Sequence, residues 1–418
     1  MKIRNTFIAV ISAMLAMLFC ACPEPTSYPP PPPSEIADDL KTGLPIMFIY
    51  TENEKPIVSK EKYLKATFYM FDMTDVESPK LTLSTTTEIR GRGNDAWTLP
   101  KKPYCLRFDE KQSLFGLEAY RDWVLLANYR DYTLIMTNIA FELGRRFELP
   151  FTHHAFPVEV VVNDKHVGSY VLTEHKEVGK GRVDIDKNEG WWVEADTYFD
   201  EDPKFESNIL KLPFMISSPK NLSASGYDFV KKDLNQFEAK LFEPNYPNNG
   251  FMNLMNVNTF IDFIMINEIV QNYELLHPKS MYWYKDKGDD AKISLGQLWD
   301  FDWAFDFNPN NERYFADYRG VIFGNPIDRI GAKLLNKLFE SPELKALYKE
   351  RWNEKYATIL SMTEYIDEQA KLLQESQKRN AAIWGWKGND PDYMKEIELM
   401  KRWWLNRVNF LNSRIQNY

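Results

Sequence analysis

Residues 299–306 read Trp-Asp-Phe-Asp-Trp-Ala-Phe-Asp and place three carboxylates among large aromatic side chains. If this segment is a strand, alternate side chains share a face, so Asp300 and Asp302 point together toward one site. Such carboxylates are ligands for hard divalent cations, and Mg²⁺ is usually held together with substrate phosphates. A strand end whose acids cap a turn or pair with arginines is the other interpretation. The spacing therefore indicates either a metal site or a charged strand terminus.

A second group of residues has the composition of a phosphate site. Residues 88–97 end a predicted strand with two glycines and two arginines, Arg90 and Arg92, and Lys101 and Lys102 lead into the next strand. Guanidinium groups and open backbone amides at such a position bind phosphates. A lone Gly-x-Gly is more often only a tight turn. Glycine, arginine and lysine in one strand-loop-strand unit favour an anion-binding site.

Further polar residues lie at the ends of predicted elements. Glu174 closes an apolar strand, from where its carboxylate can orient a lysine, and an exposed strand-end acid is the alternative. Glu194 and Asp196 share one face of another apolar strand and are either ligands or edge charges. Asn128 and Asp131 precede a predicted helix, where N-capping explains such residues without any function. The sequence leaves the roles of these five residues open.

The elements that position these side chains indicate an α+β protein. Alternating and β-branched runs predict strands first, and helical spacing of apolar residues dominates toward the C-terminus. Strands are predicted at 45–50, 63–70, 81–90, 280–285 and 293–299, a hairpin at 156–173 with its turn at Asn163 and Asp164, and helices at 134–147, 257–271 and from 332 onward. One folded domain, 44–418, would then have a β-rich part at about 44–250 and a helical part at about 251–418.

The overall composition is that of a globular protein. The chain has 418 residues, of which 44% are hydrophobic and 27% charged, which is enough to bury one large core or two smaller ones. Asp and Glu outnumber Lys and Arg by 60 to 51, for a net charge of −9. Nucleic-acid binding needs a broad basic surface to neutralise the phosphate backbone. We therefore expect no nucleic-acid partner.

The N-terminus has the pattern of a secretion signal. Two basic residues precede an apolar run at 7–19, which has the length of a signal-peptide core rather than of a membrane span. Cys22 follows a small residue, as in a bacterial lipoprotein cleavage site, with Cys20 as the second choice and a non-lipidated signal as the alternative. We expect a lipoprotein signal peptide at 1–21 and a proline-rich tether at 22–43. The protein would be exported and attached to the bacterial cell envelope, at the outer membrane or cell surface, through its lipid only.

Taken together, these motifs resemble the CotH family of spore-coat and secreted kinase-like proteins. The resemblance rests on Arg-Gly-Arg-Gly-Asn at 90–94 with Trp97, Lys-Lys-Pro-Tyr at 101–104, residues 122–129, residues 160–174 and Trp-Asp-Phe-Asp at 299–302, in this order over about 44–410. The family implies an atypical protein-kinase-like fold with a β-rich N-terminal lobe and a mainly helical C-terminal lobe. It also implies ATP and a divalent metal, Mg²⁺ or else Mn²⁺ or Ca²⁺, as cofactors. The implied reaction is phosphorylation of serine or threonine in secreted or surface proteins.

The resemblance implies roles for the basic residues and for one acid. Lys101 or Lys102 would hold the ATP phosphates, and Arg90 and Arg92 would support them. Glu174 would pair with the lysine. In phosphoryl transfer such groups neutralise charge on the phosphates and hold donor and acceptor in line.

The metal and catalytic positions match the family less completely. Asp302 would bind the metal with help from Asp300, because residues 302–304 stand where kinases have Asp-Phe-Gly. Glu274 stands where the family has its catalytic Asp, and Lys279 with Ser280 where an Asn second metal ligand is expected. The extra methylene of Glu moves the carboxylate by about an ångström, and misplacement on that scale costs about a hundredfold in rate.

Two functions remain open on this sequence. The first is a surface-tethered, ATP-dependent phosphotransferase, in which Asp262 or His277 is an alternative catalytic base to Glu274. The second is a catalytically degenerate kinase-like fold that acts as a structural or ligand-binding module at the cell surface. A third possibility is hydrolysis or carbohydrate processing by carboxylate pairs such as Asp300 and Asp302. We expect a monomer.

Overall fold

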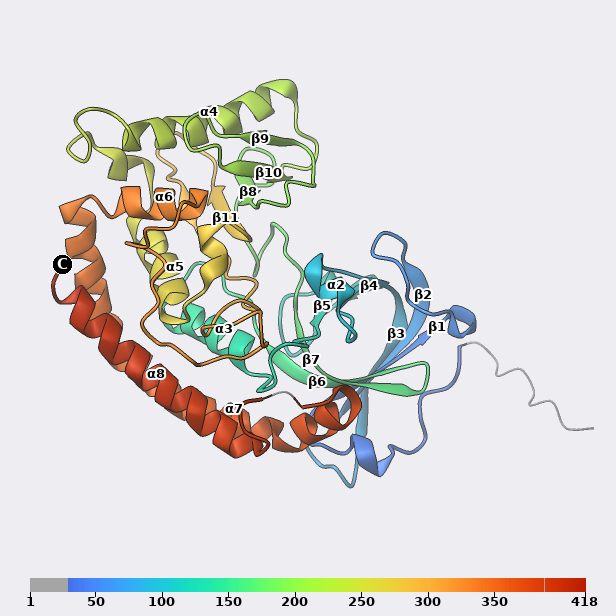
Figure 1. The fold of residues 1–418 in the computed structure, drawn as a ribbon. Coiled ribbons are helices and arrows are strands. Elements are labelled where there is room, and N and C mark those ends of the chain that lie inside the picture. The colour runs from blue at the N-terminus through green and yellow to red at the C-terminus, as the bar shows by residue number, and fades with distance from the viewer. Residues whose placement is uncertain (1–28, 387) are drawn as a thin grey trace, which may run out of the picture.

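The computed structural model describes residues 29–386 and 388–418, and the first part of the chain forms a closed β-barrel (Figure 1). The strand order around the barrel is β1-β2-β3-β4-β5-β7-β6. Neighbouring strands are antiparallel except β1 and β6, which pair in parallel and close the barrel. The strands are β1 (Ile46–Thr51), β2 (Leu64–Asp72), β3 (Lys80–Gly91), β4 (Tyr104–Gln112), β5 (Tyr120–Leu126), β6 (Phe156–Val162) and β7 (Lys165–Glu174).

Apolar side chains fill the barrel and set its register. Phe68 of β2 and Phe108 of β4 are fully buried and meet edge to face, with ring centroids 5.1 Å apart. The predicted β6–β7 hairpin is confirmed, and its turn residues Asn163 and Asp164 have φ of 47° and 59°. Two consecutive left-handed residues are what a two-residue hairpin turn requires, and Asn and Asp tolerate that conformation.

A second sheet lies apart from the barrel, with strand order β12-β11-β8-β10-β9 (Figure 1). Its strands come from both halves of the chain, because β8 pairs with β11 across nearly ninety intervening positions, as in the register of Glu194 with Tyr282. Helix α4 belongs to the same end of the molecule in Figure 1. The elements are β8 (Trp191–Ala195), β9 (Lys204–Glu206), β10 (Pro213–Ser218), β11 (Met281–Lys285), β12 (Ser294–Leu295) and α4 (Ala224–Leu241).

The helices pack around α5 (Val257–Ile269), in which nearly every residue is buried. A helix that is apolar all round is typical of a core element. Helix α7 (Pro342–Trp384) contacts α3, α5, α8 and the barrel strand β7, and its Trp384 Nε1 donates to Val167 O at 3.1 Å. The remaining helical elements are η1 (Asp38–Leu40), η2 (Glu52–Glu54), α2 (Asp95–Thr98), α3 (Met136–Arg146), η3 (Phe251–Leu254), η4 (Tyr273–Leu276), α6 (Ile330–Leu338) and α8 (Tyr393–Ile415).

The predicted architecture of a kinase-like fold, with a β-rich lobe followed by a mainly helical lobe, is wrong. The described residues form a closed barrel of seven strands and a separate five-stranded sheet, which is not a typical two-lobe kinase arrangement. The barrel closes through β1 and β6, and the second sheet draws β11 and β12 from the part expected to be helical. The broader α+β assignment fits this mixture of strands and helices.

The predictions for the N-terminus concern residues outside the described part of the chain. The signal peptide at 1–21 and the lipidation site Cys22 both precede residue 29. Among residues 29–386 and 388–418, no helix combines the length and hydropathy needed to cross a membrane.

Candidate functional site

A cleft of about 1070 Å³ lies between the barrel, the second sheet and the segments that follow α5 and β12. Its lining contains most of the residues that the sequence singled out, although the most distant of them are more than two hundred positions apart. The cleft brings together Arg90, Arg92, Lys101, Asn128, Glu194, Asp196, Glu274, Asp300 and Asp302, whereas Lys102 and Glu174 are not part of its lining.

Asp300, Asp302 and Glu274 form what we call the acidic floor of the cleft. The segment of Asp300 and Asp302 is not a strand, contrary to the expectation from their alternate spacing. Strand β12 ends at Leu295, and Asp300 and Asp302 lie in the irregular segment that follows it. Asp300 has a φ of 64°, an uncommon conformation for a residue other than glycine. Its carbonyl accepts a hydrogen bond from Asn272 Nδ2 at 3.1 Å, and the Asp302 carbonyl accepts one from Tyr314 Oη at 3.2 Å. Backbone contacts, rather than strand alternation, present the two carboxylates to the cleft.

Three carboxyl groups of the floor affect one another's protonation. Burial raises the pKa of Asp302 to about 7, and the neighbouring Asp300 adds to the shift. Burial also raises the pKa of Glu274 well above its usual range, and repulsion by Asp300 adds to it. Asp300 opens onto the cleft, but protein surrounds it on the other sides, so burial raises its pKa while Arg92 and Lys176 oppose the shift. Such a cluster favours a proton or another cation among the acids.

A divalent metal would have only part of its ligand shell from this floor. Among the described residues, no three His, Cys, Asp or Glu side chains are grouped closely enough to hold a metal ion by themselves. Mg²⁺ at phosphate sites commonly takes only one or two carboxylates, and substrate phosphates and water supply the rest. Asp300 and Asp302 therefore fit a metal that arrives with a phosphate ligand.

A second part of the lining, here called the donor wall, contains hydrogen-bond donors without partners: Arg92, Asn128 and Arg130. The Arg92 guanidinium lies 5.2 Å from the ring centroid of Trp299 and makes no hydrogen bond or ion pair with a described side chain or carbonyl. Asn128 Nδ2 and Arg130 Nε are buried atoms without a hydrogen-bond partner in the described residues, although Arg130 Nη1 pairs with Asp95. Asn128 also has a φ of 45°, and such conformations concentrate at functional sites. Unpaired buried donors are costly, so this wall suits a ligand rich in acceptor oxygens.

The other predicted phosphate-site residues have partners of their own. Arg90 donates to the Lys60 carbonyl and lies over the Tyr63 ring. Lys101 is fully buried, where its Nζ donates to the Ser169 carbonyl and, at 2.8 Å, to Asn380 Oδ1. Burial lowers the pKa of Lys101 to about 7. Although Lys101 contributes to the lining, its ammonium group is bound between the barrel and α7.

Lys102 and Glu174 do not contact each other. Lys102 Nζ donates to the Trp97 carbonyl at 2.7 Å and lies over the ring of the same residue. Glu174 accepts from the His154 backbone at 2.8 Å and pairs with His154 Nδ1 at 2.6 Å. In the described part of the chain, the partner of Glu174 is therefore a histidine and not a lysine.

A different lysine reaches the floor of the cleft. Lys176 follows β7 by two residues, and its Nζ lies 3.6 Å from Glu194 Oε2 and in contact with Tyr282 Oη. Tyr282 Oη in turn donates to Glu194 Oε1 at 2.6 Å. The sequence singled out Glu194 but not Lys176. The available signal was that Lys176 lies two residues after Glu174, the candidate acid at the end of a predicted strand.

The alternative catalytic bases differ in how free they are. Glu274 lines the cleft, with Oε1 3.9 Å from Lys279 Nζ and Oε2 without a hydrogen-bond partner among the described residues. Asp262 accepts two hydrogen bonds from Arg351, at 2.8 and 2.9 Å, and does not line the cleft. His277 is also outside the lining. Of these three residues, Glu274 is the one that can reach a ligand in the cleft.

Asp131 matches the structural interpretation of its position. Its carboxylate accepts the backbone N–H groups of Thr133, Leu134 and Met136 at 2.8–2.9 Å and so holds the turn into α3. Carboxylates at helix N-termini satisfy donors that have no partner in the helix. The capping alternative therefore accounts for Asp131.

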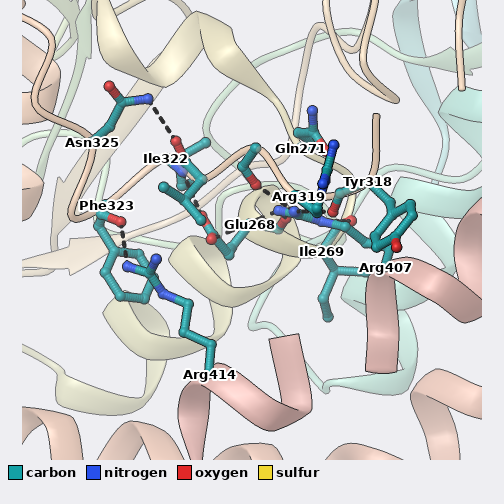
Figure 2. A network of polar contacts seen from close by, with 12 residues as sticks. Glu268, Ile269, Gln271, Tyr318, Arg319, Ile322, Phe323, Asn325, Arg407 and Arg414 are labelled. Atoms are coloured by element: carbon teal, nitrogen blue, oxygen red, sulfur yellow. Dashed lines mark hydrogen bonds and ion pairs between the residues drawn. The ribbon is translucent and has the colours of Figure 1, made fainter. Parts of the chain in front are cut away.

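A buried network of polar contacts fixes the end of α5 (Figure 2). Arg407 is fully buried and donates to the carbonyls of Glu268, Ile269, Tyr318 and Gly320. The Glu268 carboxylate accepts from the Ile322 backbone at 2.8 Å. A cation at a helix C-terminus is stabilising because it interacts with the last carbonyls. The network thereby anchors the chain just before the segment that bears Glu274.

The comparisons with known proteins agree with the sequence motifs. No curated protein matches the chain. The family model described as CotH kinase protein matches residues 89–411, which include the barrel strands from the end of β3 onward, the cleft and the helices. The chain therefore belongs to the CotH family, whose members are kinase-like proteins.

Proposed function

We propose that this protein binds ATP with a divalent metal in the cleft and transfers the terminal phosphoryl group to serine or threonine hydroxyl groups of secreted or surface proteins. The observation that carries the proposal is that one cleft is lined both by donors without a hydrogen-bond partner, namely the Arg92 guanidinium, Asn128 Nδ2 and Arg130 Nε, and by the carboxylates of Asp300 and Asp302. A metal-bound polyphosphate needs both kinds of group at once.

The donor wall supports binding of the phosphates. Arg92, Asn128 and Arg130 would donate to phosphate oxygens, and hydrogen bonds to charged acceptors are about twice as strong as those between neutral groups. Asp300 and Asp302 would hold the metal, which supplies charge neutralisation on the phosphates. The cleft volume of about 1070 Å³ leaves room for an acceptor side chain beside a nucleotide.

Glu274 is the residue we assign to proton transfer. As the acceptor oxygen bonds to the γ-phosphorus, the bond from that phosphorus to the bridging oxygen breaks and ADP leaves, while Glu274 takes the hydroxyl proton. Burial raises the pKa of Glu274, so this carboxyl has to lose its proton, as a bound cation nearby would favour, before it can act as the base. Oε2, a buried atom without a hydrogen-bond partner among the described residues, is the atom that would accept the proton.

One observation favours a second candidate function. Lys279 Nζ lies 3.9 Å from Glu274, close to where a second metal would be expected, and its positive charge opposes a second cation. A cleft with a single metal and an altered base is compatible with a module that binds nucleotide without transferring phosphate. This module would act at the same place, the bacterial envelope, to which we propose the lipid on Cys22 attaches the protein.

Thermal unfolding with ATP, with Mg²⁺ and with both tests binding first. A ligand that binds only the folded state stabilises it by about 2.7 kcal/mol at a concentration one hundred times its Kd. We expect a shift in Tm that requires ATP and metal together and that Asp302→Asn abolishes, whereas Asp290→Asn, an exposed charge-matched control, keeps it. The absence of any shift over a wide concentration range would contradict both functions.

Transfer of ³²P from [γ-³²P]ATP to envelope proteins then separates the two candidates. Labelled serine or threonine that disappears in Asp302→Asn supports the transferase. Metal-dependent ATP binding without labelled protein and without release of ADP supports the non-catalytic module. The intact mass of the mature protein tests the lipid on Cys22.

A further inference from the structure

We infer that Lys176, oriented by Glu194 and Tyr282, is the lysine that binds the nucleotide phosphates in this cleft. The inference rests on the proposed nucleotide binding. It replaces the expectation that either Lys101 or Lys102 holds the phosphates. It also assigns to Glu194 the orienting role that the sequence suggested for Glu174.

The geometry argues against the two lysines of the Lys-Lys-Pro motif. The Lys101 ammonium is enclosed by Ser169, Asn380 and the ring of Tyr170, whose centroid is 4.6 Å from Nζ. To reach a nucleotide it would have to leave two hydrogen bonds and a buried site. Lys102 is bound to the Trp97 carbonyl and lies outside the cleft lining.

Lys176 is placed where a phosphate would meet the acidic floor. Its Nζ lies 5.5 Å from the ring centroid of Trp299, the residue before Asp300. The Arg92 guanidinium lies 5.2 Å from the centroid of the same ring. Two cations beside one ring repel each other, and here the Asp300 carboxylate, whose pKa is raised by burial and lowered by both of them, interacts with the pair. His175 senses both charges, because burial lowers its pKa to about 3 and Arg92 and Lys176 add to the effect. The neutral imidazole therefore adds no third positive charge to this pair.

The hydrogen-bond capacity of Lys176 leaves room for a ligand. An ammonium group has three donors. One is donated to Tyr282 Oη, which can accept because its own proton is donated to Glu194, whereas the Glu194 carboxylate is an ion-pair partner at 3.6 Å. A further donor is therefore available for a phosphate oxygen. Glu194 and Tyr282 are register partners on β8 and β11, so a rigid sheet determines the direction of the lysine.

This pair corresponds chemically to an ion pair on which phosphoryl transfer depends in kinases, where a glutamate holds a lysine against the phosphates. Here it is formed within the second sheet and the segment after β7, and not within a motif of adjacent lysines. Lys176 is thus assigned a binding role, and Glu194 a positioning role that acts through Lys176.

The test compares two lysines in the same background. Lys176→Met should weaken metal-dependent ATP binding at least tenfold in calorimetric titration, while Lys102→Met should bind within about twofold of the wild type. Glu194→Gln should lower kcat more than it raises KM for ATP, because the lysine remains but loses its orientation, and Glu194→Asp should restore part of kcat. A Lys102→Met variant that loses ATP binding while Lys176→Met retains it overturns the inference.

A second measurement does not depend on the folding of any variant. Acylation of exposed amines in the wild-type protein, read by mass spectrometry, should show Lys176 protected by ATP with Mg²⁺ and Lys102 labelled to the same extent with and without it. Equal labelling of Lys176 under conditions where calorimetry shows bound ATP refutes the inference but leaves the proposed function intact. Failure of the wild-type protein to bind ATP removes the proposed function first, and the inference with it.

Discussion

The network around Arg407 and the donor wall of the cleft use the same type of residue in opposite ways. Arg407 makes hydrogen bonds to four carbonyls and has the buried Glu268 carboxylate 3.7 Å from its guanidinium (Figure 2). Arg92 makes none with its guanidinium group in the described part of the chain and lies on the Trp299 ring. An arginine whose N–H donors all have acceptors in the protein stabilises the fold. An arginine without such acceptors beside a cleft can donate to a ligand. The difference separates stability from function within one region of the molecule.

The largest effect should come from breaking the saturated network. Arg407→Met leaves the Glu268 carboxylate and four carbonyls buried without their partner, and loss of one member of a buried pair costs about 3–5 kcal/mol. Urea unfolding should show this loss of unfolding free energy. Arg319→Met, in the loop that Arg407 holds, removes an exposed pair with Asp317 and should leave the urea midpoint close to that of the wild type. Similar costs for both variants would contradict the proposed importance of saturation.

The next effect concerns catalysis rather than stability. Glu274→Gln removes the proposed base but keeps the side-chain volume, so phosphoryl transfer should fall by about a hundredfold or more. ATP binding and the urea midpoint should stay close to those of the wild type, because the ligand-free carboxyl already tends to hold its proton. Glu206→Gln, an exposed control on β9, should leave transfer unchanged. A large drop in urea stability for Glu274→Gln would instead place this residue with the structural group.

The pH dependence of stability tests another buried cation, Lys101. Its pKa is lowered to about 7 in the folded protein, whereas an unfolded lysine has its ordinary higher value. The unfolded state therefore binds more protons between these values, so the Lys101 contribution makes the protein more stable as pH rises above 7 and less stable as pH falls through 7. The slope is at most about 1.4 kcal/mol per pH unit. Urea unfolding of wild type and Lys101→Met from pH 7 to 9 should differ by this slope, and parallel curves would show that Lys101 stays charged in the folded state.

The sequence predicted the local elements of this protein better than their assembly. Alternation and turn chemistry located the β6–β7 hairpin, because burial of one face and the left-handed turn at Asn163 and Asp164 are both local requirements. Barrel closure depends on β1 pairing with β6 more than a hundred residues away, and no local pattern encodes that contact. The expected kinase-like lobes failed for this reason.

In the candidate site, the sequence likewise indicated the chemical type of several residues but not their positions in space. Asp300 and Asp302 were recognised because acids among aromatic residues are costly without a partner, Arg92 because it lies with glycines and lysines in one strand-loop-strand unit, and Glu274 through the family resemblance. Their convergence on one cleft follows from the irregular segment after β12 and from the second sheet, neither of which periodicity predicts. Lys176 escaped notice because its importance depends on Tyr282 and Glu194, which reach it only through the pairing of β8 with β11.

The smallest effect should come from a single donor of the cleft wall. Asn128→Gly removes the unpartnered amide while keeping the φ of 45° accessible, so the backbone is not strained by the change. Loss of one hydrogen bond to a charged phosphate should weaken ATP binding by about 1.5 kcal/mol, or roughly tenfold, in calorimetric titration.

The matched control for this variant is Asn53→Gly. Asn53 also has a positive φ, 54°, but it is exposed in η2 and far from the lining of the cleft. Both substitutions change the flexibility of the unfolded chain in the same way, so their difference in unfolding free energy should be small. Only Asn128→Gly should affect ATP binding. If both variants bind ATP like the wild type, the unpartnered amide of Asn128 does not contact the phosphates, and the donor wall is reduced to its two arginines.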